Sequence, residues 1–68
     1  MLGKVKMDEL KNRMAYYRQE AKEGHYHNPY DVENALYDIL MKMGIKKASV
    51  GVKLEDEIFE IAELFYTL

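Results

Sequence analysis

The spacing of apolar residues changes at Glu55, and this change constrains the fold more than any other feature of the chain. Between residues 47 and 54, apolar and polar residues alternate strictly, which predicts a half-buried strand at about residues 48–53. From residue 55 onward the apolar residues recur at helical spacing, which predicts a C-terminal amphipathic helix at about residues 55–67. The inward face of the predicted strand carries Ala48, Val50, Val52 and Leu54, and that of the helix carries Ile58, Ile61, Ala62, Phe65 and Leu68.

Two helices are predicted before the strand, at about residues 8–23 and 29–43. The first has one narrow apolar stripe, formed by Leu10, Met14, Tyr17 and Ala21. The second buries Val32, Leu36, Ile39, Leu40 and Met43. The predicted fold class is therefore mainly α: a helical hairpin, a short strand and a C-terminal helix, in one small domain of residues 1–68.

Local signals mark the ends of these helices. Gly24 ends the first helix, and Asn28 followed by Pro29 has the residue types of a helix N-cap and first helical position. Gly44 suits the left-handed residue that follows a helix, with Ile45 packing back in the Schellman manner. The predicted strand needs a hydrogen-bonding neighbour, either residues 2–6 or the same strand of a second copy.

Size and composition limit how such a domain can be stabilised. A chain of 68 residues buries only about 60% of its unfolded surface, and it is marginal without a disulfide, a metal or a partner. The chain has no cysteine, so a disulfide is excluded and a reducing compartment, the cytoplasm, is expected. A second copy of the chain is the expected support, which predicts a homodimer.

The sequence offers little that could perform catalysis. It has no cysteine, its single serine is Ser49, its single threonine is Thr67, and its four glycines are scattered. Neither hydroxyl has a neighbouring histidine in the sequence, and no glycine-rich phosphate loop is present. We therefore expect a non-enzymatic protein without a cofactor.

His25 and His27 are the residues with most potential as metal ligands. They flank Tyr26 in the sequence. Glu20 and Glu23 precede them, and Asp31 follows them, within a few residues. Imidazole and carboxylate groups could together hold zinc at an interface shared with another chain. The favoured interpretation is a polar loop between helices, in which the imidazole rings pack against tyrosines. No metal is assigned.

Aromatic and acidic residues predict a binding surface for another protein. Six tyrosines are present, and Tyr16, Tyr26, Tyr30 and Tyr66 have weak claims to burial, which fits either interface residues or the boundary packing of a small domain. Residues 55–68 carry five acids and no base. The residues expected to contact a protein partner are Phe59, Phe65, Tyr66, Asp56, Glu60 and Glu63. The acidic stripe of Asp56, Glu60 and Glu63 should be solvated or should face a basic surface, either that of Lys11, Arg18 and Lys22 or that of a partner.

The segment KKASVGVKLEDEIFEIAELF resembles the strand and first helix of the ribbon–helix–helix family, DNA-binding dimers whose paired strands enter the major groove. The resemblance covers about residues 47–66, and no segment corresponds to the family's second helix. It implies that the outward residues of the strand, Lys47, Ser49, Gly51 and Lys53, read bases. The residues expected to contact nucleic acid in this alternative are Lys46, Lys47, Ser49 and Lys53. Gly44 and Ile45 also resemble the turn of helix-turn-helix proteins, and Val50 then matches the buried residue of their recognition helix, although the alternation across 47–54 favours a strand.

Two functions are therefore expected in order of preference. The first is a small regulator, adaptor or inhibitor that binds another protein as a homodimer. The alternative is a dimeric DNA-binding transcription regulator that uses residues 46–53. A net charge of −2 gives the alternative no support from bulk electrostatics.

Overall fold

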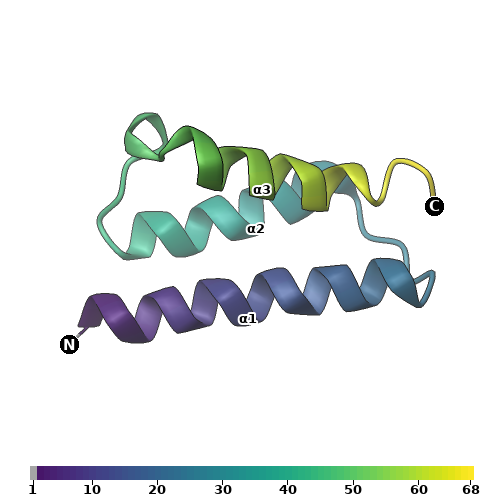
Figure 1. Ribbon diagram of the computed structural model, residues 1–68, viewed down its shortest axis with the longest axis horizontal. Coiled ribbons are helices and arrows are strands. Elements are labelled where there is room, and N and C mark those ends of the chain that lie inside the picture. The colour runs from purple at the N-terminus through teal and green to yellow at the C-terminus, as the bar shows by residue number, and fades with distance from the viewer. Residues whose placement is uncertain (1) are drawn as a thin grey trace.

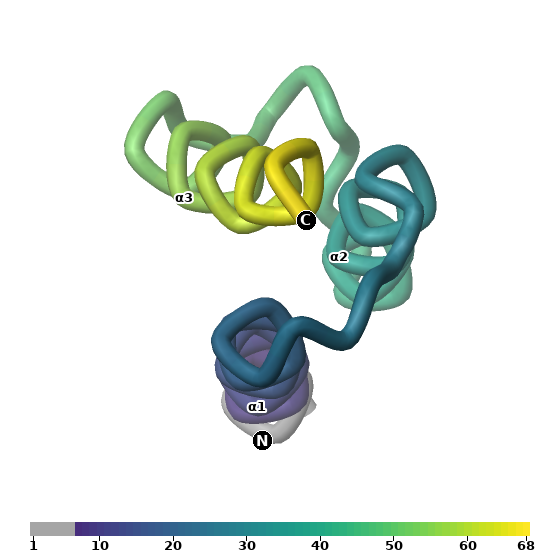
Figure 2. Tube along the Cα trace, turned by 90° about the vertical axis from the view of Figure 1, so that its right-hand side faces the viewer, coloured from purple at the N-terminus to yellow at the C-terminus, as the bar shows by residue number. Residues whose placement is uncertain are grey.

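The computed structural model describes the backbone of residues 2–68 and the side chains of residues 7–68. It contains three α-helices, α1 (Leu2–Lys22), α2 (Pro29–Lys42) and α3 (Val52–Glu63), and a 3₁₀ turn, η1 (Lys47–Ser49), before α3. Successive helices run in opposite directions, so the α1–α2 connection and the C-terminus lie at the same end (Figure 1). Seen end-on, the helices stand at the corners of a triangle, and each contacts the other two (Figure 2). None of the described helices is long and apolar enough to cross a membrane.

All three helices contribute their predicted apolar stripes to one core. The buried residues are Leu10, Met14, Tyr17, Val32, Leu36, Tyr37, Ile39, Leu40, Ile58, Ile61, Ala62 and Phe65. Ala21 and Met43 are partly buried against this cluster. Leu68 differs from the prediction, because it lies beyond the last helical turn and is 49% exposed.

The helix ends follow the predicted local signals. The Asn28 side-chain oxygen accepts a hydrogen bond from the Tyr30 backbone N–H at 2.9 Å, and Pro29 is the first residue of α2. After α2, Gly44 adopts a left-handed φ of 84°. Its N–H donates to Met41 O, and the Ile45 N–H donates to Leu40 O at 3.1 Å, which is the Schellman pattern. The predicted signals at both ends of α2 are therefore confirmed, and α1 and α2 pack side by side in opposite directions (Figure 1).

The predicted strand at residues 48–53 is wrong. Lys47–Ser49 form η1, Gly51 is the N-cap of α3, and α3 begins at Val52. No strand is present anywhere in residues 2–68. Val52 should face inward on the predicted strand, yet it is 74% exposed.

The reason lies in backbone hydrogen bonding. A lone strand leaves its N–H and C=O groups without ladder partners, whereas turns and helices satisfy them locally. Ser49 N–H donates to Lys46 O at 2.8 Å, and Glu55 N–H donates to Gly51 O at 3.0 Å. Leu54 remains partly buried because, with Ile58 and Ile61, it also fits one face of a helix.

The other helix boundaries also differ from the prediction. Helix α1 begins at Leu2, so the possibility that residues 2–6 form a pairing strand is wrong as well. Helix α3 ends at Glu63 instead of about residue 67. The next residues form turns in which Phe65 N–H donates to Ala62 O and Tyr66 N–H to Glu63 O. These turns bring the C-terminal residues to the end of the bundle where α1 meets α2 (Figure 1).

Candidate functional site

Two features lie together at the end of the bundle formed by the α1–α2 connection and the C-terminal turn. One is a polar cluster centred on Glu20, and the other is a hollow lined by aromatic residues. The Phe65 ring joins them, because it lines the hollow and contacts the His27 ring with centroids 5.5 Å apart.

The aromatic hollow is built from the start of α2 and the C-terminal turn. It is lined mainly by Tyr26, Pro29, Tyr30, Phe65, Tyr66 and Leu68. Pro29 and Phe65 are buried and form its floor. The three tyrosines are exposed by 60–67%, which is a large fraction for aromatic side chains gathered at one place.

Several carboxylates lie near the hollow. The pKa of Tyr66 is raised, first by its interaction with the Tyr30 hydroxyl and by burial, and to a smaller extent by the carboxylates of Glu33 and Glu63. Glu63 is exposed at the end of α3, and Asp31 is exposed beside Tyr30. A ligand for this hollow would therefore combine apolar surface with positive charge.

The polar cluster owes its geometry to the end of α1. Gly24 adopts a left-handed φ of 77°, Gly24 N–H donates to Ala21 O at 3.0 Å, and His25 N–H donates to Glu20 O at 2.8 Å. This is a second Schellman motif. In such a motif the residue after the glycine folds back over the last helical turn, and here that residue is His25 over Glu20.

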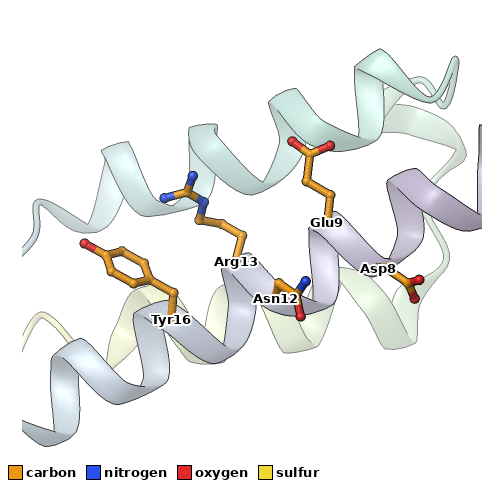
Figure 3. Close-up of a pocket in the computed structure, with 5 residues that line it drawn as sticks. All are labelled: Asp8, Glu9, Asn12, Arg13 and Tyr16. Atoms are coloured by element: carbon orange, nitrogen blue, oxygen red, sulfur yellow. The ribbon is translucent and has the colours of Figure 1, made fainter.

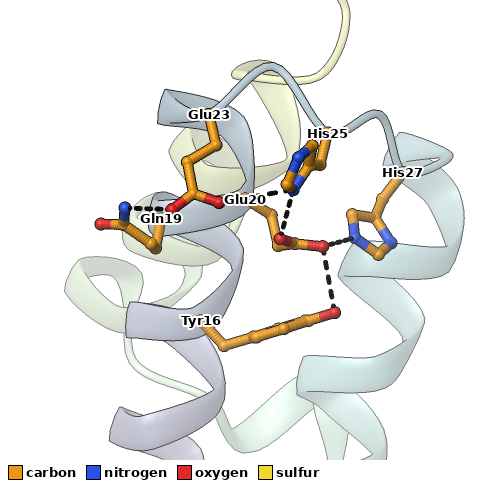
Figure 4. Close-up of polar contacts among 6 residues, drawn as sticks. All are labelled: Tyr16, Gln19, Glu20, Glu23, His25 and His27. Carbon is orange, nitrogen blue, oxygen red and sulfur yellow. Dashed lines mark hydrogen bonds and ion pairs between the residues drawn. The ribbon is translucent and has the colours of Figure 1, made fainter.

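The Glu20 carboxylate is the centre of the cluster. Its Oε2 lies 2.9 Å from His25 Nδ1, while its Oε1 accepts from His27 Nε2 at 2.8 Å and from the Tyr16 hydroxyl at 3.1 Å (Figure 4). Glu23 joins at the edge, with Oε2 3.4 Å from His25 Nδ1 and Oε1 bonded to Gln19. The cluster thus ties α1 to the connection that leads into α2.

These contacts change the acidity of three groups. Hydrogen bonds from His27, His25 and Tyr16 lower the pKa of Glu20 to about 2, so its carboxylate is ionised at neutral pH. The pKa of His25 is raised by its hydrogen bond to Glu20, and that of Tyr16 is raised mainly by the same carboxylate.

The two histidines have different environments. His27 packs edge-on against the rings of Tyr16, Tyr17 and Phe65, with centroids 5.4–5.9 Å apart, which confirms the predicted packing of imidazole against tyrosine. His25 is 59% exposed and faces two carboxylates. Glu20, Glu23 and His25 place one potential ligand atom each within 4.8 Å of one another. Asp31 does not belong to this group.

The residues predicted to contact a protein partner are divided by the fold. Tyr66 is exposed in the hollow, Phe65 is part of the core beneath it, and Phe59 is half-buried on α3. Asp56, Glu60 and Glu63 are exposed. No ion pair joins them to Lys11, Arg18 or Lys22 within residues 7–68.

The residues of the nucleic-acid alternative lie at the opposite end of the bundle. Lys46, Lys47, Ser49 and Lys53 are all exposed. They stand on η1, its flanks and the first turn of α3, and so do not form the ribbon that the alternative needs. Lys47 is engaged within the chain, with Nζ 4.8 Å above the Tyr37 ring centroid and 4.0 Å from Glu33 Oε1. Val50, the residue that matched a recognition helix, lies before α3.

A third surface feature is a groove along α1. It is lined by Asp8, Glu9, Asn12, Arg13 and Tyr16, all from this one helix (Figure 3). Arg13 places its guanidinium 5.4 Å from the Tyr16 ring centroid. The side chains point in different directions along the helix, so they converge on no common point.

Sequence reasoning identified Tyr66 and the weak burial of Tyr26 and Tyr30, but it did not bring these residues together. Pro29 and Leu68 were not expected to take part in a binding surface at all. Their meeting depends on where α3 ends, and the sequence pattern predicted a longer helix.

Comparisons with protein-family models, curated proteins and solved structures found no match to this chain.

Proposed function

We propose that this protein is a small non-enzymatic module that binds another protein through the aromatic hollow. One observation carries the proposal: three largely exposed tyrosines and Leu68 are assembled over a buried floor of Pro29 and Phe65. Tyrosine is enriched in protein interfaces because a large apolar ring and a polar end lose little conformational freedom on binding. Exposed apolar groups gathered in this way are typical of interaction sites.

The charge around the hollow indicates the chemistry of the ligand. The carboxylates of Glu33 and Glu63 contribute to the raised pKa of Tyr66, and Asp56 and Glu60 are further exposed acids of α3. The ligand we propose is therefore a short segment of another protein in which an apolar residue is flanked by Lys or Arg. The apolar residue would occupy the hollow between Tyr30 and Tyr66, and the basic residue would face Glu63.

The homodimer remains a prediction with narrower support. One of its two grounds was an unpaired strand, which the described residues do not contain. The other was the small size of a chain that has no disulfide to support it, and the exposed side chains of Leu64, Tyr66 and Leu68 offer apolar surface for such a contact, with exposed fractions of 43–61%. We place the activity in the cytoplasm as part of the proposal, since a chain without cysteine gains nothing from an oxidising compartment.

A displayed library of random peptides, selected on the immobilised protein, tests the proposal. Enriched peptides should share an apolar residue next to Lys or Arg. Their affinity should fall at least about tenfold for Tyr66→Ala or Tyr30→Ala, the size of effect expected of an interface anchor. Both side chains are more than 60% exposed, so these variants should fold.

Val52→Ala is the matched control, because Val52 is another largely exposed apolar residue, at the other end of the bundle. It should leave peptide affinity unchanged. Peptides that bind the tyrosine variants as well as the unmodified protein would contradict the proposal, as would a failure to enrich any common pattern. Binding of mixed-sequence duplex at moderate salt would instead favour the nucleic-acid alternative. Light scattering that shows a dimer dissociated by Tyr66→Ala would identify a second copy as the occupant.

A further inference from the structure

A separate inference concerns the cluster at the end of α1 and does not depend on the proposed function. Among the residues with described side chains, Glu20, Glu23 and His25 are the one group whose potential metal ligands converge. Glu20 lies in the last turn of α1, Glu23 directly follows the helix, and His25 follows Gly24, so a single Schellman motif positions all three.

We propose that Glu20, Glu23 and His25 bind a divalent transition-metal ion of the zinc type. The ligand atoms are His25 Nδ1 and one carboxylate oxygen from each glutamate. One or more remaining positions would be taken by water, as is usual for a site with three protein ligands.

Two of the three distances between ligand atoms are close to those that such an ion requires, and all three are within 4.8 Å. Zinc binds imidazole nitrogen and carboxylate oxygen at about 2.0–2.2 Å, so neighbouring ligand atoms of a tetrahedral site stand about 3.3 Å apart. His25 Nδ1 lies 2.9 Å from Glu20 Oε2 and 3.4 Å from Glu23 Oε2. Small side-chain rotations would open the shorter distance and admit an ion between the three atoms.

The surroundings of Glu20 support the assignment. Its Oε1 is already held by His27 Nε2 and the Tyr16 hydroxyl, so Oε2 is turned toward His25 and Glu23 (Figure 4). Metal-binding carboxylates are commonly oriented in this way by hydrogen bonds to groups that do not touch the metal. The negative end of the α1 dipole also lies here and favours a cation.

The choice of metal follows from the ligand atoms. One imidazole nitrogen with two carboxylates suits zinc and its neighbours, whereas calcium and magnesium take oxygen ligands almost exclusively. To bind, His25 must present Nδ1 without its hydrogen, either by losing the imidazolium proton or by carrying its hydrogen on Nε2. The Glu20 carboxylate then exchanges its bond to His25 for a bond to the metal.

Calorimetric titration of the tag-free protein with zinc chloride at pH 7 tests this site. We expect one ion per chain and no saturable binding of magnesium or calcium. His25→Ala and Glu23→Gln should each weaken zinc binding at least about tenfold. Both positions are 47–59% exposed, so the variants should fold. Glu60→Gln, which changes an exposed carboxylate of α3, should have no effect.

Nitrogen chemical shifts of the two histidines identify the ligand directly. Zinc should move the Nδ1 resonance of His25 and leave the ring of His27 nearly unchanged, because His27 is held against Tyr16, Tyr17 and Phe65. Absence of saturable zinc binding would overturn the proposal. So would equal affinity in the His25→Ala and Glu23→Gln variants, or a zinc-induced shift confined to His27.

Discussion

His27 Nε2 lies 2.8 Å from Oε1 of Glu20, a residue seven positions earlier in the chain and on the preceding helix. This contact closes the α1–α2 connection, because Glu20 belongs to the last turns of α1 and His27 stands two residues before α2. The same imidazole packs on Tyr17 and Phe65, so the polar cluster and the core meet at this ring. The end of the bundle that carries the proposed sites is thereby fixed by both polar and apolar contacts.

Substitution of Val52 by Asp distinguishes the observed helix from the predicted strand. On the strand, Val52 would be buried and an unpaired charge there would unfold the domain. In the structure it is the first residue of α3 and 74% exposed, so Val52→Asp should stabilise the protein by about 0.3–1 kcal/mol through the helix dipole. Urea denaturation gives the free energy of unfolding.

The matched variant is Ile58→Asp, two turns later and fully buried. It should lower the free energy of unfolding by more than about 4 kcal/mol, because it buries a charge without a partner. Comparable destabilisation by both substitutions would contradict the start of α3 at Val52.

The success and failure of sequence reasoning have the same physical origin. The end of α2 was predictable because the residues that form it, Leu40 to Ile45, are neighbours in the chain and bond to one another. The strand was not predictable in the same way, since a strand exists only if another segment pairs with it. Alternation of Val50, Val52 and Leu54 cannot reveal that no partner is in reach.

The two candidate sites differ in the same way: one is formed by residues that are close in the chain and the other by residues that are far apart. The sequence groups Glu20, Glu23 and His25 with His27 and Asp31, because all five residues are close in the chain. In the structure the potential ligand atoms of the first three converge. The aromatic hollow was missed because Tyr30 and Tyr66 are far apart in the chain. Their proximity follows from α3 ending at Glu63 and from the turns that fold residues 64–67 back.

Substitution of Gly44 by Ala should destabilise the protein by about 1–2 kcal/mol. Gly44 has a φ of 84°, which residues with a Cβ rarely adopt, and an added Cβ would meet no atom within 4 Å. The cost therefore comes from the backbone conformation alone. Chemical denaturation measures it.

Gly51 supplies the control for this experiment. Its φ is −66°, and an added Cβ again meets no atom within 4 Å. Gly51→Ala should change the free energy of unfolding by no more than about 0.5 kcal/mol. Equal effects at the two glycines would show that the left-handed conformation of Gly44 is not required.

Removal of the Tyr37 hydroxyl should stabilise the domain. This hydroxyl is buried without a hydrogen-bond partner among the described residues, and burial is the main cause of the raised pKa of Tyr37. Tyr37→Phe removes an unsatisfied polar group, keeps the ring beneath Lys47, and should raise the free energy of unfolding by about 1 kcal/mol. Thermal and urea denaturation should agree.

Tyr26→Phe is the corresponding control, because the Tyr26 side chain is 60% exposed and water can solvate its hydroxyl. Its stability should equal that of the unmodified protein. A loss of stability in Tyr37→Phe would indicate that the buried hydroxyl has a partner such as an internal water molecule.

The contribution of Glu20 to stability should depend on pH in a defined way. Its pKa is lowered from 4.5 to about 2 in the folded protein, so its stabilising effect is complete above pH 4.5 and disappears as the pH falls toward 2. The pKa of His25 is raised above 6.5, so the part that comes from His25 is complete below pH 6.5 and declines as the pH rises through the raised value. The difference in unfolding free energy between the unmodified protein and Glu20→Gln should therefore be largest between about pH 4.5 and 6.5.

Urea denaturation across pH 2–8 measures this difference, with Glu60→Gln as the control that should show little dependence on pH. A difference for Glu20→Gln that stays constant from pH 2 to 8 would mean that the carboxylate is not held by His25 and His27.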